Sequence, residues 1–246
     1  MPKGTTPRFR ARFNETQADI LAAQTLRHRC FRGGEGLDAD PYDDICRHML
    51  VEDVATGKLV ACFRLMPFPD GASIGDSYSA QFYELSALRD YASPMIEMGR
   101  FCIDPDAQDG ADILRVAWGA MTHYVDQENI GLMFGCSSFQ GTDEARYLDT
   151  FALLRDRHIA PKRWLPRVKA PKVFRFAQRL RRTPDAKRAM LGLPPLLRTY
   201  LMMGGWVSDH AVVDHDLNTL HVFTGVEIAS VPPARARLLR AVAAPA

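Results

Sequence analysis

The alternation of apolar and polar residues along the chain predicts a series of helices and strands. Residues 16–31 open with Thr16 and continue with helical spacing, which predicts a capped helix. Residues 48–53 and 59–66 are strand-like and are joined by a short turn, so they predict an antiparallel hairpin. A second helical segment is expected over residues 79–90.

The most informative pattern lies between residues 95 and 124. The apolar run 95–103 contains Glu97 and Arg100, and a polar loop with Gly110 and a long amphipathic segment follow it. This order predicts a strand, a turn and a helix whose free N-terminal N–H groups suit a phosphate. Glu97 and Arg100 lie on opposite faces of a regular strand, unless a β-bulge redirects one of them. Charges inside a buried strand are costly, which favours a functional role for both.

The second half of the chain continues the mixture of helices and strands. The pattern predicts strands over 130–139, 211–214 and 220–224, helices over 143–157 and 194–203, and a basic C-terminal helix or tail. The sum is an α+β fold (mixed α/β), with helices on the faces of a mixed sheet and a basic excursion before the last strands.

Composition indicates an ordinary globular protein in a reducing compartment. The 246 residues are 47% hydrophobic and 24% charged, and no apolar run reaches the length of a transmembrane helix. The basic N-terminal residues lack the apolar region of a secretory signal. The five cysteines are scattered, and Cys46-x-His48 has no second ligand pair. We therefore expect reduced thiols in the cytosol and no metal site.

The charges are segregated along the chain. The segment from Arg155 to Arg188 contains thirteen Lys and Arg and two Asp, so its net charge is +11. The rest of the chain contains 18 basic and 27 acidic residues, so its net charge is −9. Helical spacing would put the apolar residues of segment 173–180 opposite Arg175, Arg179 and Arg182. No nucleic-acid reading helix or zinc module is present, so we expect an acidic carrier protein or an anionic membrane surface as partner and no nucleic acid.

Several polar residues have both a chemical and a structural interpretation. The acidic loop around Asp40 and Asp43 is either a rim for a substrate ammonium or a solvated loop of capping carboxylates. Arg64 is either an edge residue or the buried partner of a carboxylate such as Glu97. The small residues 135–139 either admit an extended thioester arm or pack tightly. Serine hydrolase, Walker and zinc-protease motifs are absent.

A set of short motifs follows in a recognisable order over about residues 20–228. They are Arg27…Phe31, Asp40-x-x-Asp43-x-x-Cys46-x-His48, Cys62-Phe63-Arg64-Leu65, Phe82-Tyr83-Glu84-Leu85, Glu97-x-Gly99-Arg100-Phe101-Cys102-Ile103, Leu132-x-Phe134-Gly135-Cys136-Ser137-Ser138-Phe139 and Pro194-Pro195-Leu196-Leu197-x-x-Tyr200-Leu201. This order resembles the bacterial L-ornithine N(α)-acyltransferases, which make lyso-ornithine lipid from ornithine and a 3-hydroxyacyl–acyl carrier protein. More distantly it resembles acyl-homoserine lactone synthases and the GNAT superfamily, whose sheet splays between two strands to admit pantetheine.

The resemblance has two departures. Arg47 stands where an acidic residue is expected between Cys46 and His48. The loop before Gly110 is a poor phosphate cradle, which suits a carrier-linked donor because carrier-linked pantetheine lacks the nucleotide pyrophosphate.

The resemblance implies a role for each candidate residue. Glu97 is the leading general base, His48 is the second candidate, and Arg100 completes the catalytic set. The substrate-binding residues are Asp40, Asp43, Arg64 and Arg27. Asp40 and Asp43 hold the distal ammonium of ornithine. Arg64 and Arg100 hold the carboxylate of ornithine or brace Glu97. The acyl and pantetheine site comprises Phe101, Cys102, Ile103, Gly110, Ala111, Ser137 and Ser138, with main-chain N–H groups stabilising the oxyanion. Carrier or membrane docking falls to Lys169, Lys172, Arg175, Arg179 and Arg182.

We accordingly expect an N-acyltransferase with a GNAT-like fold. The donor is a 3-hydroxyacyl-phosphopantetheine on acyl carrier protein, and no cofactor is permanently bound. The expected parts are a basic tail (1–15), a catalytic core (16–160), a basic helical insertion (161–193) and a C-terminal helix and strands completing the domain (194–246). The expected location is cytoplasmic, with peripheral contact at the inner membrane face. The alternatives are an acyl-homoserine lactone synthase-like enzyme and a non-enzymatic peripheral membrane protein.

Overall fold

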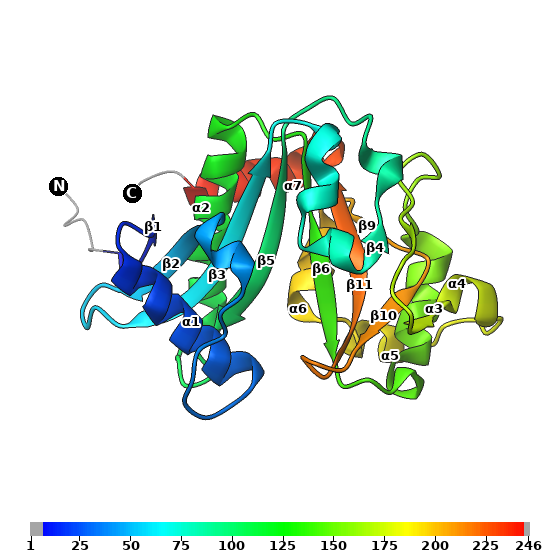
Figure 1. The fold of residues 1–246 in the computed structure, drawn as a ribbon, viewed down its shortest axis with the longest axis horizontal. Coiled ribbons are helices and arrows are strands. Elements are labelled where there is room, and N and C mark those ends of the chain that lie inside the picture. The colour runs from blue at the N-terminus through cyan, green and yellow to red at the C-terminus, as the bar shows by residue number, and fades with distance from the viewer. Residues whose placement is uncertain (1–6, 244–246) are drawn as a thin grey trace. The chain divides into compact units, whose positions relative to one another are not determined.

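A computed structural model describes residues 7–243 and divides the chain into two compact units (Figure 1). Unit 1 comprises Met1–Pro67, Met98–Ile130 and Pro233–Ala246, and unit 2 comprises Phe68–Glu97 and Gly131–Pro232. The boundary passes through strand β5 (Met95–Ile103) after Glu97. Each unit combines strands with helices, as the α+β prediction requires.

Unit 1 has a sheet with helices packed against it. Its strand order is β1 (Phe9–Phe13), β2 (Arg47–Asp53), β3 (Leu59–Phe68) and the C-terminal part of β5, in which β1 and β3 each pair antiparallel with β2. Its helices are α1 (Gln17–Phe31), α2 (Gly110–Gln127) and α7 (Pro233–Ala243). The structure confirms the predicted hairpin and the predicted strand–turn–helix.

Local sequence explains where α1 starts and how it packs. Thr16 accepts from the N–H of Asp19, and the Asp19 carboxylate accepts from the N–H of Thr16, so both satisfy free N–H groups of the first turn. Ala23 and Leu26 then face the sheet, where a small core also contains Leu50, Cys62 and Cys102. The end of α1 that carries Arg27 is thereby fixed on this sheet.

Unit 2 has a mixed sheet whose antiparallel strands extend from one parallel pair. The order is the start of β5, β6 (Leu132–Gln140), β11 (Thr219–Glu227), β10 (Ala211–Asp214) and β8 (Val173–Phe174), and β9 (Trp206–Val207) also pairs with β11. β4 (Tyr83–Glu84) and β7 (Arg167–Val168) form a separate pair. The parallel ladder joins three residue pairs and ends at Glu97↔Phe134.

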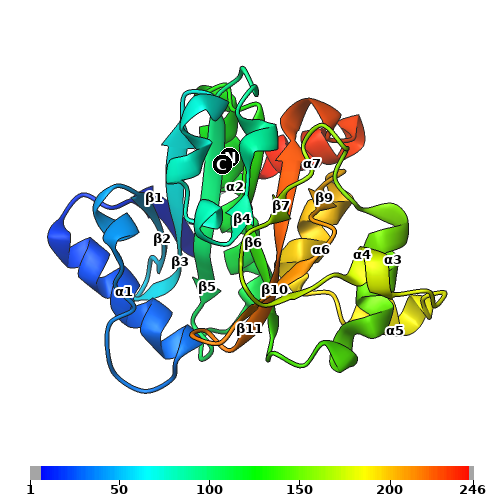
Figure 2. The same ribbon diagram turned by 45° about the vertical axis from the view of Figure 1, so that its right-hand side comes forward.

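The helices of unit 2 cover an aromatic core. They are α3 (Leu148–Arg157), α4 (Phe176–Arg179), α5 (Ala186–Leu191) and α6 (Pro195–Met202), and Figure 2 shows α3, α4 and α5 side by side. Phe139 and Phe151 lie 5.0 Å apart between ring centroids, and Phe151 stacks on Phe176 at 5.1 Å. The face of β6 that carries Phe139 is therefore buried.

Three element predictions are wrong. Residues 79–90 form two short 3₁₀ helices, η3 (Ser79–Gln81) and η4 (Ser86–Leu88), separated by β4, and not one α-helix. Residues 173–180 are not one amphipathic helix, because Val173 and Phe174 pair with β10 and only Phe176–Arg179 is helical. Residues 9–13 are not a tail, because β1 pairs along its whole length with β2. In each case pairing with a distant segment overrides local spacing.

Among the described residues, no helix has the length and apolar character needed to cross a membrane. All five cysteines are free thiols.

Candidate active site

Six charged side chains of unit 1 form a buried ionic cluster. The members are Arg27 on α1, Asp38, Asp40 and Asp43 in and before the 3₁₀ helix η1 (Pro41–Asp44), Arg64 on β3 and Arg100 on β5. These three positive and three negative charges pair with one another, and the more exposed Arg32 also approaches Oδ1 of Asp38 at 3.8 Å. The cluster thus joins the four predicted substrate-binding residues with Arg100 of the predicted catalytic set, and it adds Asp38, for which no role was predicted.

Arg27 holds the ionic cluster together from its buried side. Its Nη1 and Nη2 each donate to the carboxylate of Asp43 at 2.8 Å, and its Nε donates to Oδ2 of Asp38 at 3.1 Å. Oδ2 of Asp43 also accepts from Nε2 of Gln24 at 2.9 Å. Burial alone would raise the pKa of Asp43, but the bonds and charge of Arg27, then the bonds from Gln24 and Arg64, hold it below its ordinary value.

Arg64 is a buried partner of carboxylates and not an edge residue. It donates to both oxygens of Asp40, at 2.5 and 3.0 Å, and to Asp43 at 2.9 Å. Burial lowers the pKa of its guanidinium, but these carboxylates raise it to a net value above the ordinary one. The carboxylate that neutralises Arg64 therefore comes from the acidic loop, and not from Glu97 as the sequence suggested.

Arg100 adopts an unusual backbone conformation inside β5. Its φ is +54°, in the left-handed region that residues other than glycine rarely occupy. Such a residue interrupts the regular alternation of a strand, as the first residue of a β-bulge does. Nε of Arg100 donates to Asp38 at 3.0 Å and Nη2 to Asp40 at 3.3 Å.

Asp40 and Arg100 form the accessible edge of the ionic cluster. Their side chains are 21% and 11% exposed, whereas the other four members are at most 4% exposed. Asp40 and Arg100 are therefore the members that a charged solute can reach with the least rearrangement.

His48 lies at the buried side of the same acidic segment. Its Nε2 is 3.0 Å from the carbonyl oxygen of Asp43, which only accepts, so Nε2 carries the proton and Nδ1 the lone pair. Burial is the main cause that lowers the pKa of His48. Nδ1 is buried without a partner among the described residues, so a neutral imidazole with a free basic nitrogen remains. The neighbouring Arg47, at the position where the sequence resemblance leads us to expect an acidic residue, stacks over the ring of Phe13 at 3.6 Å.

Glu97 in unit 2 caps the 3₁₀ helix η3. Its Oε2 accepts from the N–H of Tyr78 at 2.8 Å, and its Oε1 accepts from the N–H and the hydroxyl of Ser79 at 2.7 and 2.5 Å. The side chain is 3% exposed. Convergent donors suit an ionised carboxylate. The hydroxyl of Ser79 also lies 3.4 Å from the thiol of Cys136, so this contact links η3 to β6.

A buried polar network around Tyr83 was not predicted. The hydroxyl of Tyr83 lies 2.8 Å from the carbonyl oxygen of His221, to which it donates, and 3.1 Å from Nδ1 of the same residue. Nδ1 must therefore carry a proton, which leaves Nε2 as a buried acceptor without a partner. Burial lowers the pKa of His221 to about 4 and raises that of Tyr83. In the sequence, only the motif that contains Tyr83 drew attention to this network. His221 did not, because a single histidine in a strand does not by itself indicate a functional site.

The residues predicted for pantetheine lie on both units. In unit 1, Phe101 stacks on Phe63 at 5.4 Å, Cys102 lies 3.6 Å from the thiol of Cys62, and Ile103 ends β5. Gly110 and Ala111 begin α2, as predicted for a phosphate-binding helix start. In unit 2, Ser137 is buried and accepts from Thr224 at 2.9 Å, whereas Ser138 is exposed. The opening between strands stays a prediction.

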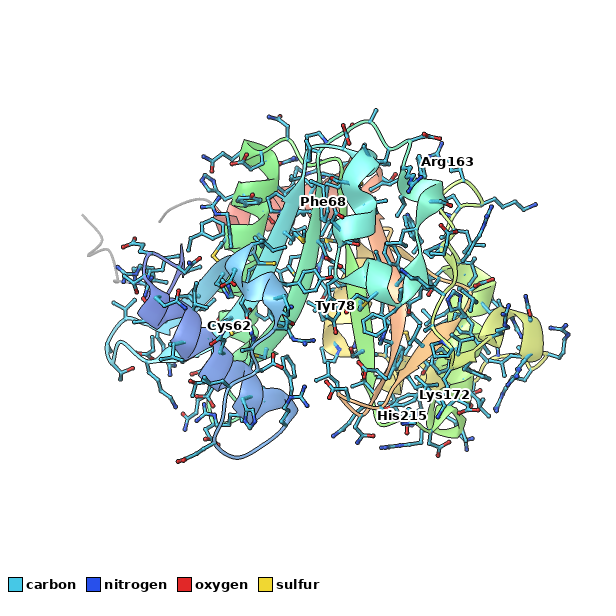
Figure 3. All side chains as sticks on the ribbon, in the orientation of Figure 1. Cys62, Phe68, Tyr78, Arg163, Lys172 and His215 are labelled. Atoms are coloured by element: carbon cyan, nitrogen blue, oxygen red, sulfur yellow. The ribbon has the colours of Figure 1, made fainter. Side chains whose placement is uncertain are left out.

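The predicted docking residues differ in their surroundings. Nζ of Lys169 donates to the carbonyl oxygen of Ala80 in η3 at 2.6 Å, and Nζ of Lys172 lies 3.4 Å from Nε2 of His215, a pair that Figure 3 labels. Arg175 and Arg179 are exposed, and Arg182 pairs with Asp149 at 2.8 Å. No cluster of three or more metal-ligating side chains exists within residues 7–243.

Comparisons with known proteins agree with the resemblance. The acetyltransferase (GNAT) domain family matches residues 25–118. An L-ornithine N(alpha)-acyltransferase of Rhodobacter capsulatus is 32% identical over 87% of this chain and 88% of its own length. One of Brucella abortus is 29% identical over 86% and 82%. The solved structure of FeeM, an N-acyl amino acid synthase from uncultured soil microbes, shares the fold with a TM-score of 0.55 at 12% identity, over 94% of this chain and 99% of FeeM.

Proposed function

We infer the reaction from the premise that this chain belongs to the L-ornithine N(α)-acyltransferases, because one member is 32% identical over 87% of the chain. The chain is an N-acyltransferase with a GNAT-like fold, and ornithine is its acyl acceptor. Beyond this, the donor is a 3-hydroxy fatty acyl group on acyl carrier protein, and the product is lyso-ornithine lipid. The observation that carries the proposal is the 32% sequence identity, which extends over 87% of this chain and 88% of the relative.

The reaction needs a neutral amine and a polarised thioester carbonyl. The α-ammonium of ornithine gives one proton to a base, and its nitrogen then attacks the carbonyl carbon. A C–N bond forms and the C–S bond breaks. The nitrogen loses a second proton as it becomes an amide, and the departing pantetheine thiolate takes up one proton. Main-chain N–H groups near Phe101 and Ile103 stabilise the oxyanion. Arg100 lies beside them in the sequence.

Glu97 and His48 are the two candidate bases, and each has a supporting observation. Glu97 accepts three hydrogen bonds that fix its carboxylate in one orientation. His48 keeps an unprotonated Nδ1 in a neutral ring. We favour Glu97, since the bonds through Ser79 link it to Cys136 in the middle of β6, the strand along which the donor arm is proposed to lie.

The ionic cluster supplies the acceptor site. Asp40 binds the distal ammonium of ornithine and Arg100 binds its carboxylate, because these are the two accessible members. The buried members Arg27, Arg64, Asp38 and Asp43 hold Asp40 and Arg100 in place, and their two positive and two negative charges balance. Preformed ion pairs reduce the reorganisation needed when the zwitterion arrives.

The carrier protein docks along residues 161–172. This segment follows η3 and β4 closely, since β7 pairs with β4 and Lys169 bonds to Ala80. Lys169 therefore places a positive charge beside η3, the segment that holds Glu97. The N-terminus of α2 takes the pantetheine phosphate.

The decisive experiment incubates the purified chain with L-ornithine and either a 3-hydroxyacyl carrier protein or the matching acyl-CoA. Mass spectrometry is expected to detect the N-acyl product and free carrier thiol, with the carrier substrate used preferentially. Failure of both donors would overturn the proposal. Efficient use of acyl-CoA alone would overturn the carrier assignment. Product formed only with S-adenosylmethionine would identify a lactone synthase instead.

Two variants separate the candidate bases. Glu97→Gln is expected to lower kcat by a factor on the order of 10²–10⁴, and His48→Gln keeps the Nε2 donor and is expected to change kcat less. Ser79→Ala is the control, since it removes one bond to Glu97 and retains the carboxylate. If His48→Gln instead abolishes the pH dependence of kcat while Glu97→Gln leaves it intact, His48 is the base.

A further inference from the structure

An exposed basic surface lies on unit 2 over residues 175–191. It comprises α4, the loop after it and α5, and we call it the α4–α5 surface; both helices pack on α3 (Figure 2). This segment contains six Lys and Arg, all exposed, and a single acidic residue, Asp185, so its net charge is +5. Its charge is therefore almost entirely of one sign.

Most of these cations have no acidic partner. Arg182 pairs with Asp149 at 2.8 Å, and Asp185 caps α5 by accepting from the N–H of Arg188 at 2.9 Å. Within the part of the chain that the structure describes, no carboxylate pairs with the remaining five side chains, which are Arg175, Arg179, Arg181, Lys187 and Arg188. Five charges thus remain available to an external anion.

The loop between the two helices is held in place from below. Arg155 on α3 donates to the carbonyl oxygens of Leu180 at 2.7 Å and Arg182 at 2.9 Å. Because its backbone is fixed in this way, the loop presents its cations with a reduced backbone ordering cost on binding.

Two large apolar side chains stand among these cations. Leu191 is 77% exposed and Met190 is 41% exposed. Ala189 is fully buried and marks the inward side of α5. At about 100° per residue, Lys187 and Leu191 both lie close to the opposite, outward side. The apolar and basic groups therefore point in the same direction.

We propose that the α4–α5 surface binds an anionic lipid membrane. The free cations contact lipid phosphates, while Leu191 and Met190 enter the boundary between headgroups and acyl chains. An acidic protein would satisfy the cations, but only an apolar medium also removes the leucine at the end of the helix from water. The surface lies in a segment other than 161–172, which is assigned to the carrier. Membrane binding therefore goes beyond the proposed acyl transfer and does not depend on it.

Vesicle co-sedimentation with the full chain tests this proposal. Vesicles of phosphatidylcholine with phosphatidylglycerol are expected to bind the protein, and pure phosphatidylcholine vesicles are not, with binding falling as salt rises. The triple variant Arg179→Gln/Arg181→Gln/Lys187→Gln is expected to bind on the order of a hundredfold more weakly. Leu191→Ser is expected to weaken binding about tenfold while salt dependence is retained.

The matched control is Val54→Ser, since Val54 is also an exposed apolar residue (44%) but lies in unit 1 beside Asp53. It is expected to bind vesicles normally. Equal binding by Leu191→Ser and the parent, or loss of binding only on Leu238→Ser in α7, would overturn the proposal. Acyl transfer from carrier protein in solution is expected to stay unchanged in Leu191→Ser. If the triple variant instead loses carrier-dependent transfer without losing vesicle binding, the surface docks the carrier protein.

Discussion

Replacing Asp43 by Asn tests whether the ionic cluster is the structural centre of unit 1. The carboxylate is 3% exposed and accepts bonds from Arg27, Arg64 and Gln24. The amide has almost the same shape, so the substitution removes one negative charge and leaves three arginines facing two aspartates. Breaking a buried ion pair by removing one partner costs about 3–5 kcal/mol. For a chain of this size, this corresponds to a fall in Tm on the order of 10 °C.

Scanning calorimetry is the suitable assay, because it records the unfolding of each unit as a separate transition if the units unfold independently. The control is Asp44→Asn, which changes the next residue, an exposed one, and is expected to shift stability by less than about 0.5 kcal/mol. A loss below about 1 kcal/mol for Asp43→Asn would show that the cluster does not depend on this charge. Asp40→Asn supplies a functional contrast, because it removes a carboxylate that is partly exposed. This substitution is expected to raise the KM for ornithine and to lower stability less than Asp43→Asn does.

Three further predictions follow from single contacts. Thr16→Ala removes the capping bond to Asp19 and is expected to cost about 1 kcal/mol in chemical denaturation, whereas Thr16→Ser is expected to be neutral. Gly71→Ala places a Cβ against the carbonyl oxygen of Leu88 and is expected to cost about 2–3 kcal/mol; an unchanged Tm would contradict that close approach. His221 has a pKa of about 4 against 6.5 in the unfolded chain, so below pH 6.5 the unfolded state binds more protons and stability falls toward pH 4. His221→Asn is expected to remove about 3 kcal/mol of the fall in unfolding free energy between pH 6.5 and pH 4. Chemical denaturation of the variant and the parent at these two pH values measures the difference.

Local patterns identified the elements whose signals lie within one segment. The cap at Thr16 and the spacing after it defined α1, and strand 95–103 followed by Gly110 defined β5 and α2. These predictions succeeded because hydrophobic periodicity and end signals are properties of neighbouring residues.

Predictions failed where a distant segment supplied the stabilising bonds. Residues 79–90 have a helical pattern, but the carboxylate of Glu97, eighteen residues beyond Ser79, caps a short 3₁₀ helix there. Val173 and Phe174 have helical spacing with the residues after them, yet β10 offers a strand edge about 38 residues later in the chain. Local spacing carries no information on either partner.

The sequence by itself determined the family, the α+β class and the set of charged residues that the chemistry needs. Only the tertiary structure decided how these charges combine: Arg64 pairs with Asp40 and Asp43, Arg27 is sealed beneath them, and Arg100 reaches Asp38 from a left-handed residue in β5. The physical reason is that ion pairing depends on distance in space and on removal from water. A sequence specifies both only after folding brings α1, η1, β3 and β5 together.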